Sequence, residues 1–250
     1  MREKSDCPDV KQLKNMYNMD ADTLAPAYPV NMEEAPMNRQ TALIMGDTAL
    51  AHWHFMNAAK PHLRETLEDA FDLTFSDDYP NITTDILKSY DLVINYTDNW
   101  TERGTTAAGV ALMTFVATGG QLLSIHSGII QPAPYFLLQM HGGKFTGHAA
   151  YATLNYRRTD IAHPVTEGIE SFFMGEEPYE FLLDPLAEKQ LVLEYEYNGK
   201  IYPAAWVMTY GFGRIVYLSP GHDARSFAEP SFRKLIRNSA LWLSPVQKGE

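Results

Sequence analysis

Short apolar segments alternate with helical patterns from Gln40 onward, and this alternation constrains the fold more than any other feature of the sequence. Segments with the length and composition of buried strands lie at 41–46, 72–76 and 92–96, and a fourth follows Gly119-Gly120. Helical spacing separates them over 55–71, around 85–87 and over 101–117. Such an alternation, with mostly apolar strands, is typical of a parallel sheet covered by helices on both faces. We therefore predict an α/β fold, a three-layer sandwich with a mostly parallel central sheet.

The second half of the chain is richer in strand-like segments. These lie at 151–157, 180–183, 190–197, 201–208 and 213–218. Gly211-Phe212-Gly213 predicts a hairpin turn, and a last helix is expected from about 231 to 243. We expect the later strands to add antiparallel neighbours to the sheet.

Length and composition favour one large domain with an appendage. A chain of 250 residues with 45% hydrophobic content can bury one substantial core, so a domain of about 200 residues is expected. We assign it to residues 40–245 and treat residues 1–39 as an N-terminal extension. The extension is expected to pack on its own domain or on a neighbouring subunit, and the alternative is a partly disordered leader. Its candidate contact residues are Leu13, Tyr17, Leu24 and Tyr28.

Charge and composition exclude several classes of partner. The 20 Lys and Arg residues against 31 Asp and Glu residues give a formal charge of -11, which repels nucleic acid and anionic lipid. The single cysteine excludes an internal disulfide framework. The amino terminus lacks the apolar core of a signal peptide, and no apolar run reaches membrane-spanning length. We expect a cytoplasmic protein that forms a homo-oligomer and binds neither nucleic acid nor membrane.

The segment Gly119–Gly128 predicts a buried strand that ends in a sharp turn carrying His126. In α/β folds, such a turn lifts one reactive side chain out of the sheet edge. Enzymes that place a cysteine there use a thiolate, but the only cysteine of this chain, Cys7, lies far upstream. Glutaminase activity is therefore not expected.

Several further polar residues follow predicted strands, where ligands gather in open parallel sheets. They are Asp47, His52, His54, Asp98, Trp100, His148, Glu176, Glu177, His222 and Asp223. For His126 and His222, adjacent glycines favour close turns that expose the ring, so a functional role is preferred. For His52, His54 and His148, capping of backbone groups is preferred.

The pair Glu176-Glu177 has two interpretations. The simpler one is a solvated acidic loop. The other is that neighbouring aromatic residues, Tyr179 among them, half-bury one carboxylate and raise its pKa into a catalytic range.

A divalent metal is a further alternative, and no other cofactor is expected. His126, His148, His222 and a carboxylate are suitable ligands, but the sequence contains no HxxxH or HExxH pair. Aromatic residues could stack on a sugar ring, although packing in the core or at its rim is the commoner role. The candidates are Trp53, Trp100, Tyr135, Tyr179 and Trp206.

Taken together, these segments resemble the ThuA-like family, named for trehalose utilisation. The matching pieces are 119–128, 142–148, 163–169, 176–179, 203–206, 210–215, 221–223 and the helix that ends in Leu241-Trp242. The resemblance implies a flavodoxin-like fold of the class I glutamine amidotransferase type, with a histidine in place of the amidotransferase cysteine. It also implies a role in sugar metabolism. The family pattern directs attention to His126, His148, Glu177, His222 and Asp223. The loop 47–52, the glutamate at 176 and the extension depart from that pattern.

We hypothesise an enzyme that cleaves or processes a keto-sugar derivative of a glycoside by acid–base chemistry. A ketone on a sugar ring acidifies the neighbouring C–H bond, so a histidine or glutamate can remove that proton without a thiol. The expected catalytic residues are His126, Glu177 and His222. The expected substrate-binding residues are His148, Asp223, Trp100, Tyr179, Asp47 and His52. The alternatives are a non-catalytic protein that binds a sugar or a partner, and a metal-dependent hydrolase.

Overall fold

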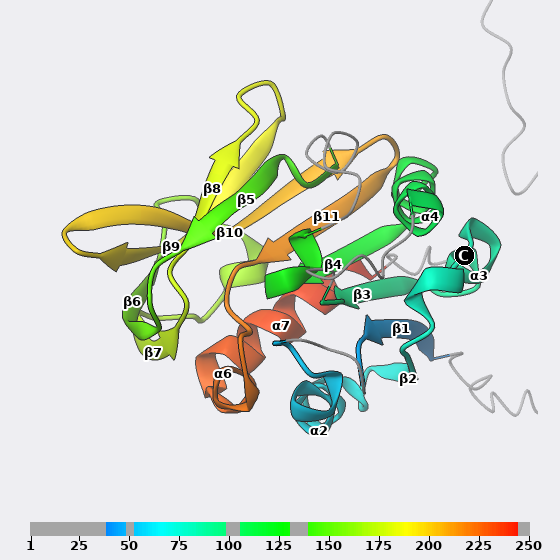
Figure 1. Cartoon of the computed structure of the whole chain (residues 1–250), viewed down its shortest axis with the longest axis horizontal. Helices are drawn as coiled ribbons and strands as arrows, with labels where there is room; N and C mark the ends of the chain where they lie inside the picture. Colours follow the sequence, from blue (N-terminus) through cyan, green and yellow to red (C-terminus); the bar gives the residue numbers. More distant parts are fainter. Residues whose placement is uncertain (1–38, 49–52, 99–105, 131–139, 245–250) are drawn as a thin grey trace, which may run out of the picture. The chain divides into compact units, whose positions relative to one another are not determined.

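The computed structural model describes residues 39–48, 53–98, 106–130 and 140–244 (Figure 1). The expected contacts of the extension, through Leu13, Tyr17, Leu24 and Tyr28, lie outside the described residues. None of the helices within the described ranges is long and apolar enough to cross a membrane.

The centre of the molecule is a nine-stranded sheet in the order β2-β1-β3-β4-β11-β10-β9-β6-β7. Five neighbouring strands run parallel: β2 (Phe71–Ser76), β1 (Gln40–Gly46), β3 (Leu92–Tyr96), β4 (Gln121–Ile125) and β11 (Gly213–Leu218). Numbered along the chain, they stand in the order 2-1-3-4-5, which is the flavodoxin-like arrangement. The predicted α/β fold with a parallel core is therefore confirmed.

The second half of the chain extends this sheet with antiparallel strands, as predicted. They are β10 (Lys200–Tyr210), β9 (Lys189–Tyr197), β6 (Ala152–Arg158) and β7 (Phe172–Glu176). The hairpin expected at Gly211-Phe212 joins β10 to β11, where Tyr210 faces Gly213. A separate two-stranded sheet is formed by β5 (Gly143–His148) and β8 (Tyr179–Leu183).

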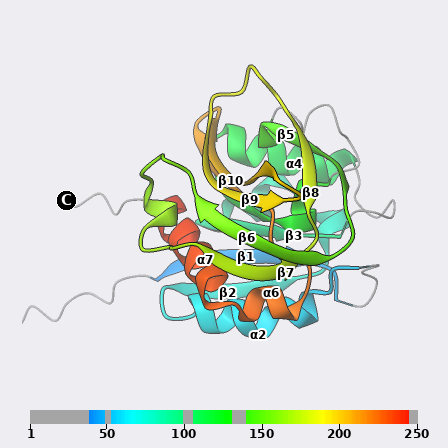
Figure 2. The same ribbon diagram turned by 90° about the vertical axis from the view of Figure 1, so that its left-hand side faces the viewer.

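Helices cover both faces of the parallel strands (Figures 1 and 2). One face carries α2 (Met56–Leu67), α6 (Ala224–Ala228) and α7 (Pro230–Leu243), which contact one another. The other carries α3 (Thr84–Lys88), α4 (Thr106–Ala117) and the short 3-10 helix η2 (Tyr79–Asn81). Two more 3-10 helices, η3 (His126–Ile129) and η4 (Pro164–Thr166), complete the described elements.

The two hydrophobic cores follow from the alternation of side chains along the strands. In β1, Ala42 and Ile44 pack in the core beneath α2 and α7, whereas Leu43 and Met45 pack in the core beneath α3 and α4. Both faces of a central parallel strand are buried, so the strand reads as one continuous apolar run. Each fully buried Leu or Ile stabilises the fold by about 1.5–3 kcal/mol.

Three parts of the fold differ from the sequence prediction. The helix expected to reach Phe71 ends at Leu67, because Phe71 begins β2 and pairs with Gln40. The strands β5 and β7 were not predicted, and neither was the short helix α6. Glycines at 143, 147 and 175 weaken the strand signal of β5 and β7.

Candidate active site

His126 lies where β4 ends and η3 begins, in the sharp turn that the sequence predicts. Its backbone φ is 49°, a left-handed conformation that costs an L-residue about 1–2 kcal/mol. The turn passes close to β3: a Cβ atom on Gly128 would lie 2.2 Å from the carbonyl oxygen of Asn95. The left-handed residue at 126 and the close approach at Gly128 are both features of a tight turn.

The turn does not expose the ring of His126, contrary to the expectation from the adjacent glycine. The residue is fully buried, and its ring stacks on Tyr179 with a centroid distance of 4.1 Å. His126 Nδ1 lies 2.6 Å from the carbonyl oxygen of Ser219. A carbonyl only accepts hydrogen bonds, so Nδ1 carries the hydrogen. Burial lowers the pKa of His126 to about 3, so the ring is neutral at pH 7 and Nε2 presents a lone pair.

Glu177 follows β7 and lies among three imidazoles. Its Oε2 is 3.5 Å from His126 Nε2 and 3.3 Å from His222 Nδ1, and its Oε1 is 3.8 Å from His148 Nδ1. Burial raises the pKa of Glu177, but the contacts with His126 and His222 outweigh it and hold this pKa well below the usual value. Interaction with Glu177 in turn raises the pKa of His222. Glu177 is therefore an ionised, mostly buried carboxylate.

Glu176 is not part of a solvated acidic loop, so the simpler interpretation of the pair is wrong. Its side chain is fully buried, and burial raises its pKa to about 7. Glu176 Oε2 accepts hydrogen bonds from the backbone N–H of Gly221 at 2.6 Å and from Ser226 Oγ at 2.8 Å. The carboxylate also accepts the N–H of His222 at 3.2 Å. Glu176 thereby ties the loop after β11, which carries His222, to the end of β7.

His54 completes the group, although the sequence favoured a backbone-capping role for it. The residue follows β1 and is buried, with ring centroids 4.6 Å from His126 and 5.3 Å from His222. Asp98, at the end of β3, accepts the backbone N–H groups of Trp53 and His54, and its Oδ1 lies 3.4 Å from His54 Nδ1. Burial raises the pKa of Asp98, but the contacts with His54 and these N–H groups outweigh it and lower the pKa to about 2. The only sequence signal for His54 was its position after the first strand.

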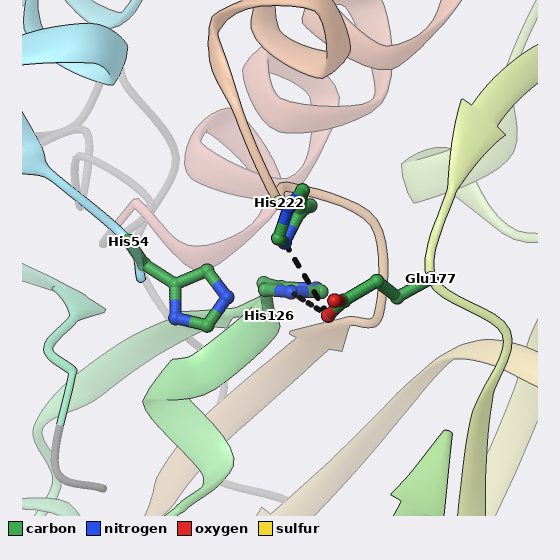
Figure 3. A group of neighbouring side chains, drawn as sticks. All are labelled: His54, His126, Glu177 and His222. Atoms are coloured by element: carbon green, nitrogen blue, oxygen red, sulfur yellow. Dashed lines mark ion pairs between the residues drawn. The ribbon is translucent and has the colours of Figure 1, made fainter. Parts of the chain in front are cut away.

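Together, His54, His126, His222 and Glu177 form a compact histidine–glutamate cluster (Figure 3). Each offers one nitrogen or oxygen atom of a metal-ligand type, and these four atoms lie within 4.8 Å of one another. The residues follow β1, β4, β11 and β7, respectively. Such a group can exchange protons with a bound molecule or bind a cation.

A cavity of about 220 Å³ opens over the cluster and is lined by Trp53, His54, His148 and Glu177. Trp53 is 62% exposed, and the His148 side chain is 36% exposed. A cavity of this size suits one small ring, and its lining combines an aromatic surface with polar groups. Trp206, by contrast, is fully buried and serves as core packing.

The other predicted binding residues have different surroundings. Asp47 is buried, and its Oδ2 accepts the backbone N–H of Asp98 at 2.8 Å. Asp223 caps α6 by accepting the N–H of Arg225, with which it also forms an ion pair. Tyr179 is fully buried behind His126. His52, Trp100 and Tyr135 lie outside the described residues.

Comparisons with known proteins agree with the fold. The sequence model of the family ThuA, described as trehalose utilisation, matches residues 41–243. A ThuA-like protein from Bacteroides uniformis is 22% identical, with a TM-score of 0.70 over 89% of this chain and 98% of that one. A ThuA-like protein from Parabacteroides merdae is 15% identical, with a TM-score of 0.67 over 85% and 93% of the two chains.

A structural likeness also extends to part of a larger enzyme. A β-galactosidase from Bacillus circulans is 15% identical, with a TM-score of 0.57 over 82% of this chain and 32% of that one. At such identities the likeness concerns the fold alone. No curated protein matches the sequence.

Proposed function

This chain belongs to the ThuA family, described as trehalose utilisation, and from that premise we propose that it cleaves a keto-sugar derivative of a glycoside at the histidine–glutamate cluster. The observation that carries the proposal is the position of the Glu177 carboxylate, which lies among three imidazoles and lines a cavity the size of one sugar ring. The description of the family, trehalose utilisation, supports a sugar as the substrate, and this carboxylate supplies the proposed chemistry.

The proposed reaction is an elimination. Glu177 removes the proton from the carbon next to the ketone, and the electron pair of that C–H bond forms a carbon–carbon double bond. The glycosidic C–O bond on the adjacent carbon breaks, and the departing oxygen takes a proton from Nε2 of His148, whose imidazole also lines the cavity. The proton on Glu177 then returns to Nε2 of His148 through solvent, because Nδ1 of His148 already donates to the carbonyl oxygen of Ala149.

The remaining residues prepare the cavity for this reaction. His222 favours the ionised form of Glu177, because its Nδ1 lies 3.3 Å from Oε2 and this contact raises the pKa of His222. Trp53 offers an exposed aromatic face at the rim, against which the apolar face of a sugar ring can stack.

The first experiment is incubation of the purified protein with 3-keto glycosides, followed by chromatographic detection of the released alcohol and sugar. Glu177→Gln keeps the size of the side chain and removes the proton acceptor, so turnover should fall about a hundredfold or more. Glu180→Gln is the matched control, because Glu180 is an exposed residue three positions along the chain. If Glu177→Gln turned over the substrate as fast as the wild type does, the assignment of Glu177 as the base would be refuted. A ligand-induced rise in melting temperature with no product would refute it too and would support a sugar-binding protein instead.

A further inference from the structure

Four buried ring nitrogens in the histidine–glutamate cluster have no hydrogen-bond partner among the described residues. They are both ring nitrogens of His54, Nε2 of His126 and Nδ1 of His222. Buried polar atoms in native proteins almost always have a partner, so several orphans in one place require an explanation. One nitrogen of each of the three histidines lies within 4.8 Å of a carboxylate oxygen of Glu177 (Figure 3).

The contact between His126 and Glu177 is favourable only when a positive charge, a proton or a metal ion, lies between the two atoms. His126 Nδ1 donates to the Ser219 carbonyl, so Nε2 presents a lone pair toward Glu177 Oε2. Two electron-rich atoms then face each other at 3.5 Å, a distance too long for a hydrogen bond of ordinary geometry. A positive ion between them would convert this repulsion into attraction.

The distances also agree with a shared ion. When zinc is bound tetrahedrally at about 2.0–2.1 Å, neighbouring ligand atoms lie about 3.3 Å apart. Glu177 Oε2 lies 3.5 Å from His126 Nε2 and 3.3 Å from His222 Nδ1. All four ligand atoms fit within 4.8 Å, so only small side-chain movements are needed to close the shell.

We propose that His54, His126, His222 and Glu177 bind one divalent transition-metal ion, with Zn²⁺ favoured by the donor set. Three imidazoles and one carboxylate suit zinc and its first-row neighbours, whereas Mg²⁺ and Ca²⁺ prefer oxygen ligands throughout. This site replaces the set suggested by the sequence, because His54 takes the place of His148. It deepens the proposed function, since it occupies the same cluster, and rests on that function only for its catalytic use.

The surroundings of the cluster hold two of the three histidines, His126 and His54, as metal sites usually require. Ring nitrogens opposite a metal commonly contact a carboxylate or a backbone carbonyl, which fixes the tautomer. His126 Nδ1 has the Ser219 carbonyl, and His54 Nδ1 lies 3.4 Å from Asp98 Oδ1, which leaves Nε2 of His54 turned toward His126 (Figure 3). The charges balance as well, because the carboxylates of Asp98 and Glu177 together neutralise a doubly charged ion.

Four protein ligands complete a tetrahedral shell, so a bound ion would have to accept a fifth ligand to polarise the ketone oxygen of a sugar in the cavity. In that arrangement it would stabilise the negative charge that develops when the neighbouring C–H bond is broken. Glu177 would keep Oε1 available on the side of His148, because only Oε2 faces His126 and His222.

The test is a titration of chelator-treated protein with Zn²⁺ by calorimetry, and with Co²⁺ by visible absorption, which reports on coordination. We expect one equivalent to bind to the wild type. Metal affinity should fall at least a hundredfold in His54→Ala and in His222→Ala. The ring of His222 is partly exposed, so the loss of this ring should leave the fold intact. His148→Ala is the matched control and should bind the metal as the wild type does.

Three results would overturn the site: less than a tenth of an equivalent bound by folded wild-type protein, His54→Ala with unchanged affinity while its circular dichroism stays native, or equal losses in His148→Ala and His54→Ala. Stoichiometric binding without turnover of keto glycosides supports the metal site and counts against the proposed function alone. Full turnover by protein that binds no metal overturns the metal site alone.

Discussion

At the scale of single residues, Glu176 positions one wall of the cluster by accepting hydrogen bonds from the loop that carries His222. Glu176→Ala leaves the N–H groups of Gly221 and His222 and the hydroxyl of Ser226 buried without their acceptor. We expect a loss of about 2–4 kcal/mol in the free energy of unfolding, measured by urea denaturation. Glu170→Ala, at an exposed position, should change it by less than about 0.5 kcal/mol. Equal stability of the two variants would contradict the positioning role.

Gly128 controls the turn at His126 through its close approach to β3. In Gly128→Ala the new Cβ would lie 2.2 Å from the carbonyl oxygen of Asn95. Relief of this clash requires a shift of the backbone, which costs more free energy than a shift of a flexible side chain. The expected cost is about 1–3 kcal/mol of stability, together with reduced metal affinity, because His126 moves with the turn. Ser127→Ala is the adjacent control: the buried Ser127 hydroxyl has no partner among the described residues, so its removal should be nearly neutral. A wild-type melting temperature for Gly128→Ala would show that the turn can relax.

The sequence identified three of the four cluster residues and missed His54 for a physical reason. His126 and His222 stood beside glycines, and Glu177 stood in an acidic pair, so each had a local signal. His54 had only its position after the first strand, because the four ligand atoms come from loops far apart in the chain and no short spacing links them. Glu176, the last residue of β7, is fully buried, whereas Glu177 follows the strand and lines the cavity. This difference could not be derived because β7 was not predicted.

At the scale of elements, α2 and α7 are joined at their surface by Arg237, which pairs with both carboxylate oxygens of Asp69 and donates to the carbonyl of Thr66. The hydrogen bond from Arg237 lowers the pKa of Asp69 below 3.8, so the folded protein favours the ionised form. The pair therefore stabilises the fold above pH 3.8 and loses this effect as the pH falls through the lowered pKa.

Asp69→Asn should accordingly reduce the urea midpoint slightly at pH 7, because exposed ion pairs contribute little. The difference from wild type should vanish in strongly acidic buffer and shrink in high salt. In a double-mutant cycle, the loss of stability caused by Asp69→Asn should depend on whether Arg237 is present. The effect of Asp72→Asn, which removes a neighbouring exposed carboxylate, should not depend on Arg237. If the urea midpoint of Asp69→Asn stayed below that of the wild type at low pH, the carboxylate would act through something other than its charge.

The elements themselves were predictable where periodicity was strong. The parallel strands and the helices α2, α4 and α7 have long apolar patterns, and their positions agree with the sequence to within a few residues. In contrast, β5 contains Gly143 and Gly147, and β7 contains Gly175, so neither has a sustained β-branched or aromatic run. Pairing with neighbours far away in the chain, rather than local propensity, makes these segments strands.

At the scale of the whole molecule, the sheet places the cluster where the parallel strands β1, β4 and β11 end, and β7 brings Glu177 to it from the antiparallel part. The sequence implied that polar residues would gather at this edge, since ligands of open parallel sheets bind beyond the carboxyl ends of the strands. Which of them meet could not be derived, because it depends on how the antiparallel strands fold back over the edge.

The late position of β11 in the chain has a consequence for biosynthesis. On the ribosome, β4 emerges long before its neighbour β11, and until then one side of β4 has no partner from the final sheet. Pairing that must wait for distant sequence is slow, and an unsatisfied strand edge attracts other chains. Because His222 follows β11, the complete cluster assembles only after β11 has emerged, so a nascent chain released before then would lack the cluster and be prone to aggregate.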